Sequence, residues 1–141
     1  MEYSRRRLGL LLPAILAAPR LFATGQDMLP SKAYPFADIP VQSKGRNKSR
    51  RILAGETHTG FPISMNENDI APGGIPHPPH HHVAEQVFIV LAGELEFTIA
   101  GQTTRLGPSS AAYVASNVEH GLKNNGTSPA RYCVITLGKN A

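Results

Sequence analysis

The chain has 141 residues, of which 41% are hydrophobic, and a formal net charge of +4 at pH 7. This length predicts one domain with a substantial core. The single cysteine, Cys133, excludes an intrachain disulfide framework and a cysteine-rich zinc or iron–sulfur site within one chain. Thirteen glycines and twelve prolines favour a β-rich fold with many turns.

Residues 1–23 have the layout of a bacterial export signal. Three arginines after Ser4 precede an apolar run over residues 10–18, and small residues follow it. The pattern predicts a leader that is not part of the fold, and a periplasmic or secreted protein. Pro13 interrupts the run, which is also too short for a hydrocarbon core of about 30 Å, so we expect no stable membrane anchor. The paired arginines resemble a twin-arginine signal, and an ordinary Sec signal is the alternative.

Residues 24–51 are expected to form an extended arm or linker, because neither a helical nor a strand period persists through residues 24–45. The basic run at residues 44–51 has no interleaved aromatic side chains. We therefore expect a solvated edge and no nucleic-acid partner. An inward role of Arg50 or Arg51 toward an anionic substrate is the alternative.

Short strand candidates, separated by turns, occupy residues 52–141. They lie at residues 52–57, 63–69, 86–92, 95–100, 103–106, 111–114, 121–124 and 131–137. Regularly spaced short strands without a helical stretch predict an all-β fold, a small antiparallel barrel or sandwich. Gly93-Glu94 and Gly101-Gln102 are compatible with tight hairpins, and Asn124-Asn125-Gly126 with a turn that requires positive φ.

The strongest chemical signal is a cluster of histidines at the entrance to the strand candidate at residues 86–92. The cluster holds four of the six histidines, His77, His80, His81 and His82. Imidazole is the commonest protein ligand for a divalent metal. The cluster therefore predicts a metal site, and an exposed tract that binds metal only adventitiously is the alternative.

Strand parity divides the candidate ligands between two faces, because side chains alternate along a strand. One face presents His80, His82 and Gln86. The opposite face presents Glu85 and the other two histidines of the cluster. A further ligand must come from elsewhere, and His120, at the start of another strand candidate, is the obvious donor; His58 is the one histidine that remains.

These residues resemble the two motifs of the cupin superfamily, over roughly residues 52–138. The first motif reads Gly, five residues, His, one residue, His, three or four residues, Glu, six residues, Gly. The matching positions are Gly74, His80, His82 and Gly93, with Gln86 in place of the usual Glu. The second motif has His, three residues and Asn after a turn, which His120 and Asn124 match, although the usual Pro-x-Gly before that histidine is absent.

The resemblance implies a double-stranded β-helix, or jelly roll, over residues 52–141, and one divalent ion. The implied ligands are His80, His82, Gln86 and His120, with positions left open for water, dioxygen or a chelating substrate. Mn or Fe is favoured over Ni or Zn, because the twin-arginine route exports folded proteins, so that the ion can be loaded away from external copper and zinc. A neutral amide leaves the ion a higher net charge, which favours an anionic ligand. Glu85 can replace Gln86 only if a bulge re-registers the strand.

Three functions are compatible with this site. The resemblance favours a dioxygenase-type enzyme, similar to quercetin-dioxygenase-like cupins, that acts on a small enol- or catechol-like chelating substrate, with Glu85 and Gln86 as candidate catalytic residues. The second is a non-redox lyase or isomerase in which the ion polarises a carbonyl and Glu85 or His81 transfers a proton. The third is a secreted small-ligand or sugar-binding cupin without turnover. Small cupins commonly pair, so we expect a homodimer, in which the arm adds an edge strand to a neighbour.

Overall fold

The computed structural model describes residues 27–141, and the expected export signal at residues 1–23 lies outside them. In chain order the elements are the 3-10 helix η1 (Phe36–Asp38) and the strands β1 (Gln42–Lys44), β2 (Asn47–Glu56), β3 (Pro62–Ile70), β4 (Glu85–Ala92), β5 (Leu95–Ile99), β6 (Gln102–Leu106), β7 (Ala111–Val114), β8 (His120–Lys123) and β9 (Ala130–Leu137). Across these described residues, no helix is long and apolar enough to cross a membrane.

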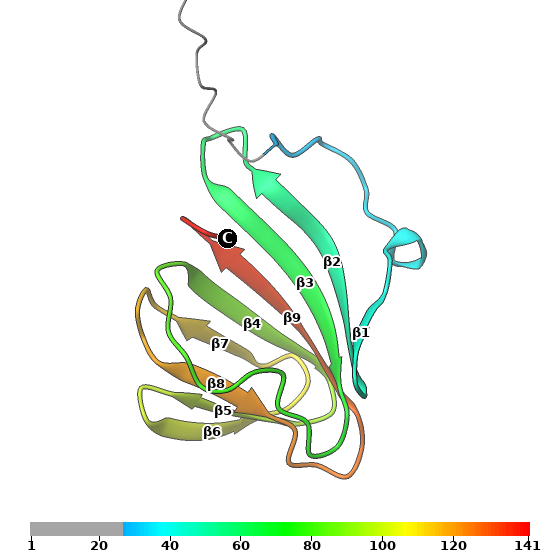
Figure 1. The fold of residues 1–141 in the computed structure, drawn as a ribbon, viewed down its shortest axis with the longest axis vertical. Helices are drawn as coiled ribbons and strands as arrows, with labels where there is room; N and C mark the ends of the chain where they lie inside the picture. Colours follow the sequence, from blue (N-terminus) through cyan, green and yellow to red (C-terminus); the bar gives the residue numbers. More distant parts are fainter. Residues whose placement is uncertain (1–26) are drawn as a thin grey trace, which may run out of the picture.

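The strands form two antiparallel sheets (Figure 1). Six strands form the larger sheet in the order β1-β2-β3-β9-β4-β7, and three form the smaller sheet in the order β6-β5-β8. Some strands that follow one another in the chain, such as β4 and β5, belong to different sheets, as in a jelly roll. The expected all-β antiparallel fold is confirmed.

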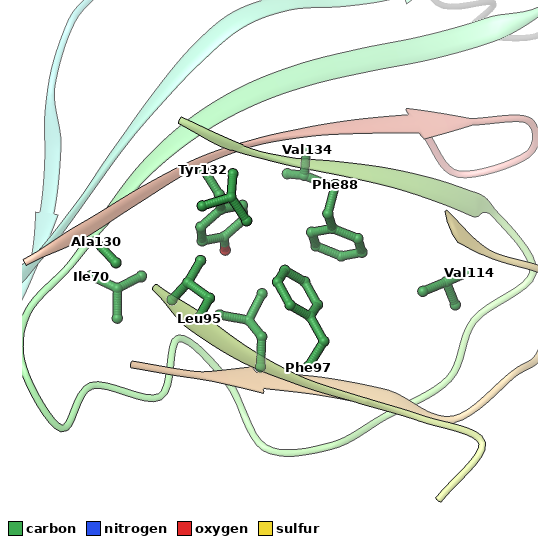
Figure 2. Packing of buried hydrophobic residues seen from close by; sticks show 10 residues of the cluster. Ile70, Phe88, Leu95, Phe97, Val114, Ala130, Tyr132 and Val134 are labelled. Atoms are coloured by element: carbon green, nitrogen blue, oxygen red, sulfur yellow. The ribbon is translucent and has the colours of Figure 1, made fainter. Parts of the chain in front are cut away.

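The core lies between the two sheets (Figure 2). Phe88 on β4 and Phe97 on β5 pack edge to face, with ring centroids 5.3 Å apart. Along β4, Phe88 and Val90 are almost fully buried, whereas the intervening Ile89 is only partly buried and Leu91 is exposed. Because side chains alternate along a strand, residues with the parity of Phe88 point between the sheets. Strand parity therefore decides which residues of β4 face the interior.

The larger sheet begins earlier in the sequence than expected. Both β1 and β2 start within the segment expected to be an arm over residues 24–51. The pairing of β2 with β3 explains this, because Arg50 lies opposite Glu67 in the register and forms an ion pair with Asp69 at 3.4 Å. The acidic partners of the basic run at residues 44–51 lie on β3, outside that run. The run taken alone therefore resembles a solvated edge.

The arm residues before β1 lie against the larger sheet. Met28 forms an isolated parallel bridge with Glu56. The guanidinium carbon of Arg50 lies 4.4 Å from the centroid of the Phe36 ring, a cation–π contact between the arm and β2. Since β1 pairs with β2 of the same chain, the arm covers an edge of its own sheet.

Two of the three expected turns differ from their prediction. The hairpin between β5 and β6 is confirmed, and Ala100 and Gly101 both have positive φ (48° and 77°) there. Gly93 does not close a hairpin but leads from one sheet to the other, with φ of 72° and Ala130 too close for a Cβ. The turn after Asn124 needs no positive φ, because the Asn124 side chain accepts a hydrogen bond of 2.9 Å from the Gly126 N–H.

Candidate metal centre

Three histidines from two distant segments meet beside the core. The imidazoles of His80, His82 and His120 converge, with one ligand-capable nitrogen of each within 4.8 Å of the others. His80 and His120 form an antiparallel bridge with backbone hydrogen bonds of 3.0 and 2.9 Å, which hold the segment before β4 against the start of β8. Pro79 packs over Gly121, where a Cβ would approach the proline ring to 3.3 Å. The expected convergence of these three histidines is confirmed.

Each ring of the triad is held by a backbone carbonyl two residues away. Nδ1 lies 3.1 Å from the Pro78 oxygen in His80, 2.7 Å from the Ala84 oxygen in His82, and 2.9 Å from the Val118 oxygen in His120. A carbonyl can only accept, so these contacts are hydrogen bonds when Nδ1 carries the proton. Nε2 of each ring then has a free lone pair, which is the arrangement that metal-binding histidines adopt.

Gln86 presents a fourth donor to the same place. Its Oε1 lies 3.0 Å from Nε2 of His120, and its amide N–H donates to Oγ1 of Thr136 at 3.2 Å. With Nδ1 of His120 protonated, Nε2 and Oε1 turn lone pairs toward each other, which is favourable only with a cation between them. Two donors that bind one ion at about 2.1 Å in neighbouring octahedral positions are about 3.0 Å apart. The donor set therefore fits a divalent ion.

Burial favours the neutral, metal-binding form of the His120 imidazole. Burial lowers the pKa of His120, and the charges of protonated His80 and His82 would lower that pKa further, against the opposing hydrogen bond to Val118. Burial and the neighbouring His80 likewise lower the pKa of His77, whose ring packs edge-on against His80 with centroids 4.4 Å apart. His120 is therefore available as a ligand at neutral pH.

Glu85 lies on the other face of β4. Its cross-strand partner is Leu137, and it lines a separate pocket on the outer side of the larger sheet. The register between β4 and β9 shifts between Val90 and Ala92, far from the start of β4, so no bulge turns Glu85 toward the triad. Of the two alternative ligands, the structure brings Gln86 to the histidines and leaves Glu85 away from them.

The other histidines do not join the triad. His81 is exposed. Nε2 of His58 lies 3.0 Å from the backbone oxygen of Leu29, where it ties the arm to the loop before β3. His77 contacts His80 at the rim, as parity predicted for a residue outside the ligand set.

Two pockets meet at the metal centre. The first, of about 570 Å³, is lined by His80, His82, Gln86 and by Arg51 on β2. The second, of about 440 Å³, shares Gln86 and Thr136 with the first. Of the two arginines, Arg51 lines this pocket, and its role toward an anionic substrate stays a prediction. Sequence reasoning missed Thr136, although its place on the inward parity of β9 between two apolar neighbours was the available signal.

Comparison with known proteins agrees with this geometry. Residues 67–136 match the family model described as "Cupin domain". A cupin described as RmlC-like from Shewanella frigidimarina superposes with a TM-score of 0.66 at 16% identity, over 78% of this chain and 94% of the other. KdgF from a Halomonas species superposes with a TM-score of 0.67 at 14% identity, over 77% and 96% of the two chains. These likenesses concern the fold.

One curated relative is similar in sequence. Over 53 residues, the chain is 38% identical to dimethylsulfoniopropionate lyase DddQ of Ruegeria pomeroyi. The match covers 37% of this chain and 26% of that lyase, so the chain spans about a quarter of the length of this relative.

The two-sheet fold and the histidine triad beside its core define a β-barrel protein with a candidate metal centre. The chain belongs to the cupin family, and it is of the small cupin-domain type.

Proposed function

We propose that this cupin is a metal-dependent enzyme that acts on a small anionic substrate by Lewis-acid chemistry, as a lyase or isomerase. The observation that carries this proposal is the donor set, in which His80, His82, His120 and Gln86 are all neutral. A divalent ion held by neutral donors keeps its full charge, and it would supply polarisation of a carbonyl or carboxylate oxygen of the substrate. Without an anionic ligand, a higher oxidation state of the ion is less well stabilised, which favours Lewis-acid over redox chemistry.

The residues of the chain hold and orient these donors. Backbone carbonyls keep the three imidazoles in the tautomer that leaves Nε2 free. Thr136 accepts the Gln86 N–H, so the amide oxygen and not the nitrogen faces His120. Arg51 lines the same pocket and attracts a negative charge to it.

The curated relative supports non-redox chemistry on a carboxylate. Its name states that it is a lyase acting on dimethylsulfoniopropionate. That compound is a carboxylate, and a lyase reaction consumes no dioxygen. The similar segment is short, and it covers 37% of this chain. Since the relative acts on dimethylsulfoniopropionate, this compound is the first substrate to test on the present protein.

A dioxygenase that acts on an enol- or catechol-like substrate is the second candidate. Its support is the histidine-rich donor set beside a pocket of about 570 Å³, which has room for a substrate and dioxygen together. It requires Mn or Fe, whereas Lewis-acid chemistry also proceeds with Zn or Ni. A secreted ligand-binding cupin would bind the same compounds without turnover.

Metal replacement and oxygen exclusion separate these functions. Stripped protein is reloaded with Zn(II) or Mn(II) and incubated in D₂O with dimethylsulfoniopropionate and a panel of hydroxy acids. Proton NMR then follows exchange of hydrogen beside the carboxylate and product formation. Activity with Zn(II), retained without oxygen and lost in His82→Ala, supports the proposal; activity only with Mn(II) and oxygen supports the dioxygenase. Binding without exchange or product in any arm would contradict both enzymes.

Export belongs to the same proposal. The arginine-rich leader over residues 1–23 would send the protein to the periplasm or the medium. A twin-arginine route would allow the ion to be bound before export. Fractionation of cells that express the full chain, beside a variant with Arg5 and Arg6 changed to Lys, tests this: a wild-type protein retained in the cytoplasm would overturn it.

A further inference from the structure

The inner wall of β3 is polar where a barrel interior is ordinarily apolar. Ser64, Asn66 and Asn68 alternate along β3 with the parity of the buried Ile70. Within residues 27–141, the side-chain amides of Asn66 and Asn68 make no hydrogen bond. Both residues are partly exposed, and each amide offers donors and an acceptor to a group that enters the pocket. This wall is therefore built to meet polar groups from elsewhere.

Tyr132 on β9 adds a hydroxyl to the same wall. Figure 2 shows its side chain projecting from β9 into the interior, with the oxygen at its far end. Only 2% of the residue is exposed. Among the described residues, its hydroxyl has no hydrogen-bond partner, and because the oxygen is not one of the fully buried unpaired atoms, it reaches the surface of the pocket. Burial raises the pKa of Tyr132, so the phenol keeps its proton and can donate it.

The register places these groups side by side and joins them to the metal centre. Asn68 lies opposite Tyr132, and Asn66 opposite Val134, in the pairing of β3 with β9. All three polar residues line the pocket of about 440 Å³ that also contains Gln86 and Thr136. Tyr132 and Thr136 are about 13 Å apart along β9. One elongated ligand can therefore reach the triad at one end and the hydroxyl of Tyr132 at the other.

The charges along the pockets favour an anion. Arg51 lines the first pocket, and Lys44 and Lys48 line the second. Asp27 lines the first pocket with Arg51, so these two side-chain charges offset each other there, and no acidic side chain of the described residues lines the second pocket. A divalent ion on neutral ligands adds further positive charge, so a carboxylate is the group that this end of the pocket attracts.

We infer that Asn66, Asn68 and Tyr132 form a second binding subsite, which holds the hydroxyl groups of a polyhydroxylated carboxylate whose acidic end lies at the metal centre. Hydroxyls both donate and accept, so they satisfy the amides and the phenol together. This inference rests on the proposed function for the acidic end and narrows its substrate class. A polyhydroxylated carboxylate differs from dimethylsulfoniopropionate, which carries no hydroxyl group.

The test is calorimetric titration of the Zn(II)-loaded protein with gluconate, and with propionate as the acid without hydroxyls. Tyr132→Phe removes a single oxygen, and Asn68→Ala removes one amide. We expect each variant to weaken gluconate binding roughly tenfold and to leave propionate and zinc affinity unchanged. Tyr113→Phe is the matched control, because Tyr113 is 55% exposed and lies on β7.

Gluconate that binds wild-type protein no more tightly than propionate would overturn the subsite. So would an unchanged gluconate affinity in both Tyr132→Phe and Asn68→Ala, since the polar wall would then hold only water. If Asn68→Ala fails to fold, Tyr132→Phe decides alone. Gluconate binding that survives zinc removal but still weakens in Tyr132→Phe supports the subsite and contradicts the metal-dependent function, so the two proposals fail separately.

Discussion

Thr136→Val tests whether the orientation of Gln86 matters to the metal centre. Thr136 is 8% exposed, and its Oγ1 accepts the Gln86 N–H at 3.2 Å. Valine has nearly the same shape, so the core should keep its packing and lose only the acceptor. The freed amide can then rotate, which turns its oxygen away from Nε2 of His120, now 3.0 Å distant.

The size of the effect follows from one hydrogen bond. A neutral hydrogen bond contributes about 0.5–1.5 kcal/mol, and loss of a group that orients a metal ligand costs about 10- to 100-fold in metal affinity. The lower end of that range corresponds to about 1.4 kcal/mol, which one lost hydrogen bond can supply. We therefore expect zinc affinity to fall about tenfold.

The assay is competition for Zn(II) against a chromophoric chelator, with stripped protein at neutral pH. Thr98→Val is the matched control, because it removes an exposed hydroxyl contact of 2.9 Å to Thr103 on the smaller sheet. Unchanged zinc affinity in Thr136→Val, with Thr98→Val also unchanged, would refute the role assigned to Gln86. A large loss of stability in urea would instead show that Thr136 acts through the fold.

Three further predictions concern pH, the thiol and assembly. Because the pKa values of His77 and His120 are lowered in the folded protein, the unfolded chain binds more protons than the folded one below about pH 6.5. The free energy of unfolding of the metal-free protein, measured in urea, should therefore fall as the pH is lowered from about 7.5 to about 5.5. A rise over this range would contradict the prediction. Burial, with the Glu67 carboxylate nearby, raises the pKa of Cys133, so iodoacetamide should alkylate it far more slowly in native protein than in urea, and equal rates would be inconsistent with burial. We expect a homodimer, which light scattering should show; a monomeric wild type would exclude it.

Much of the fold was predictable because it follows from local pattern. A short continuous apolar run after Gln86 marks β4, and the alternation of side chains along a strand separated Gln86 from Glu85. The β1 strand and the start of β2 were missed, since their charged and polar residues become strand-like only when a partner strand lies alongside. That partner is β2 for β1, and β3 with Glu67 and Asp69 for β2. The predicted hairpin at Gly93-Glu94 was wrong for a similar reason. A glycine and a glutamate between two strands do not reveal whether the two strands share a sheet.

The sequence by itself determined the metal centre in outline: the spacing of His80, His82 and Gln86, and His120 as the distant partner. The three residues His80, His82 and Gln86 lie in the segment before β4 and at its start, so one short stretch of the chain carries their spacing. Only the tertiary structure decided what surrounds these ligands. Thr136 holds the Gln86 amide from another strand, and Tyr132 and Asn68 face each other across β9 and β3. Those relations depend on which strands pair and in which register, and the free energy that sets register comes from the whole buried core rather than from any local segment.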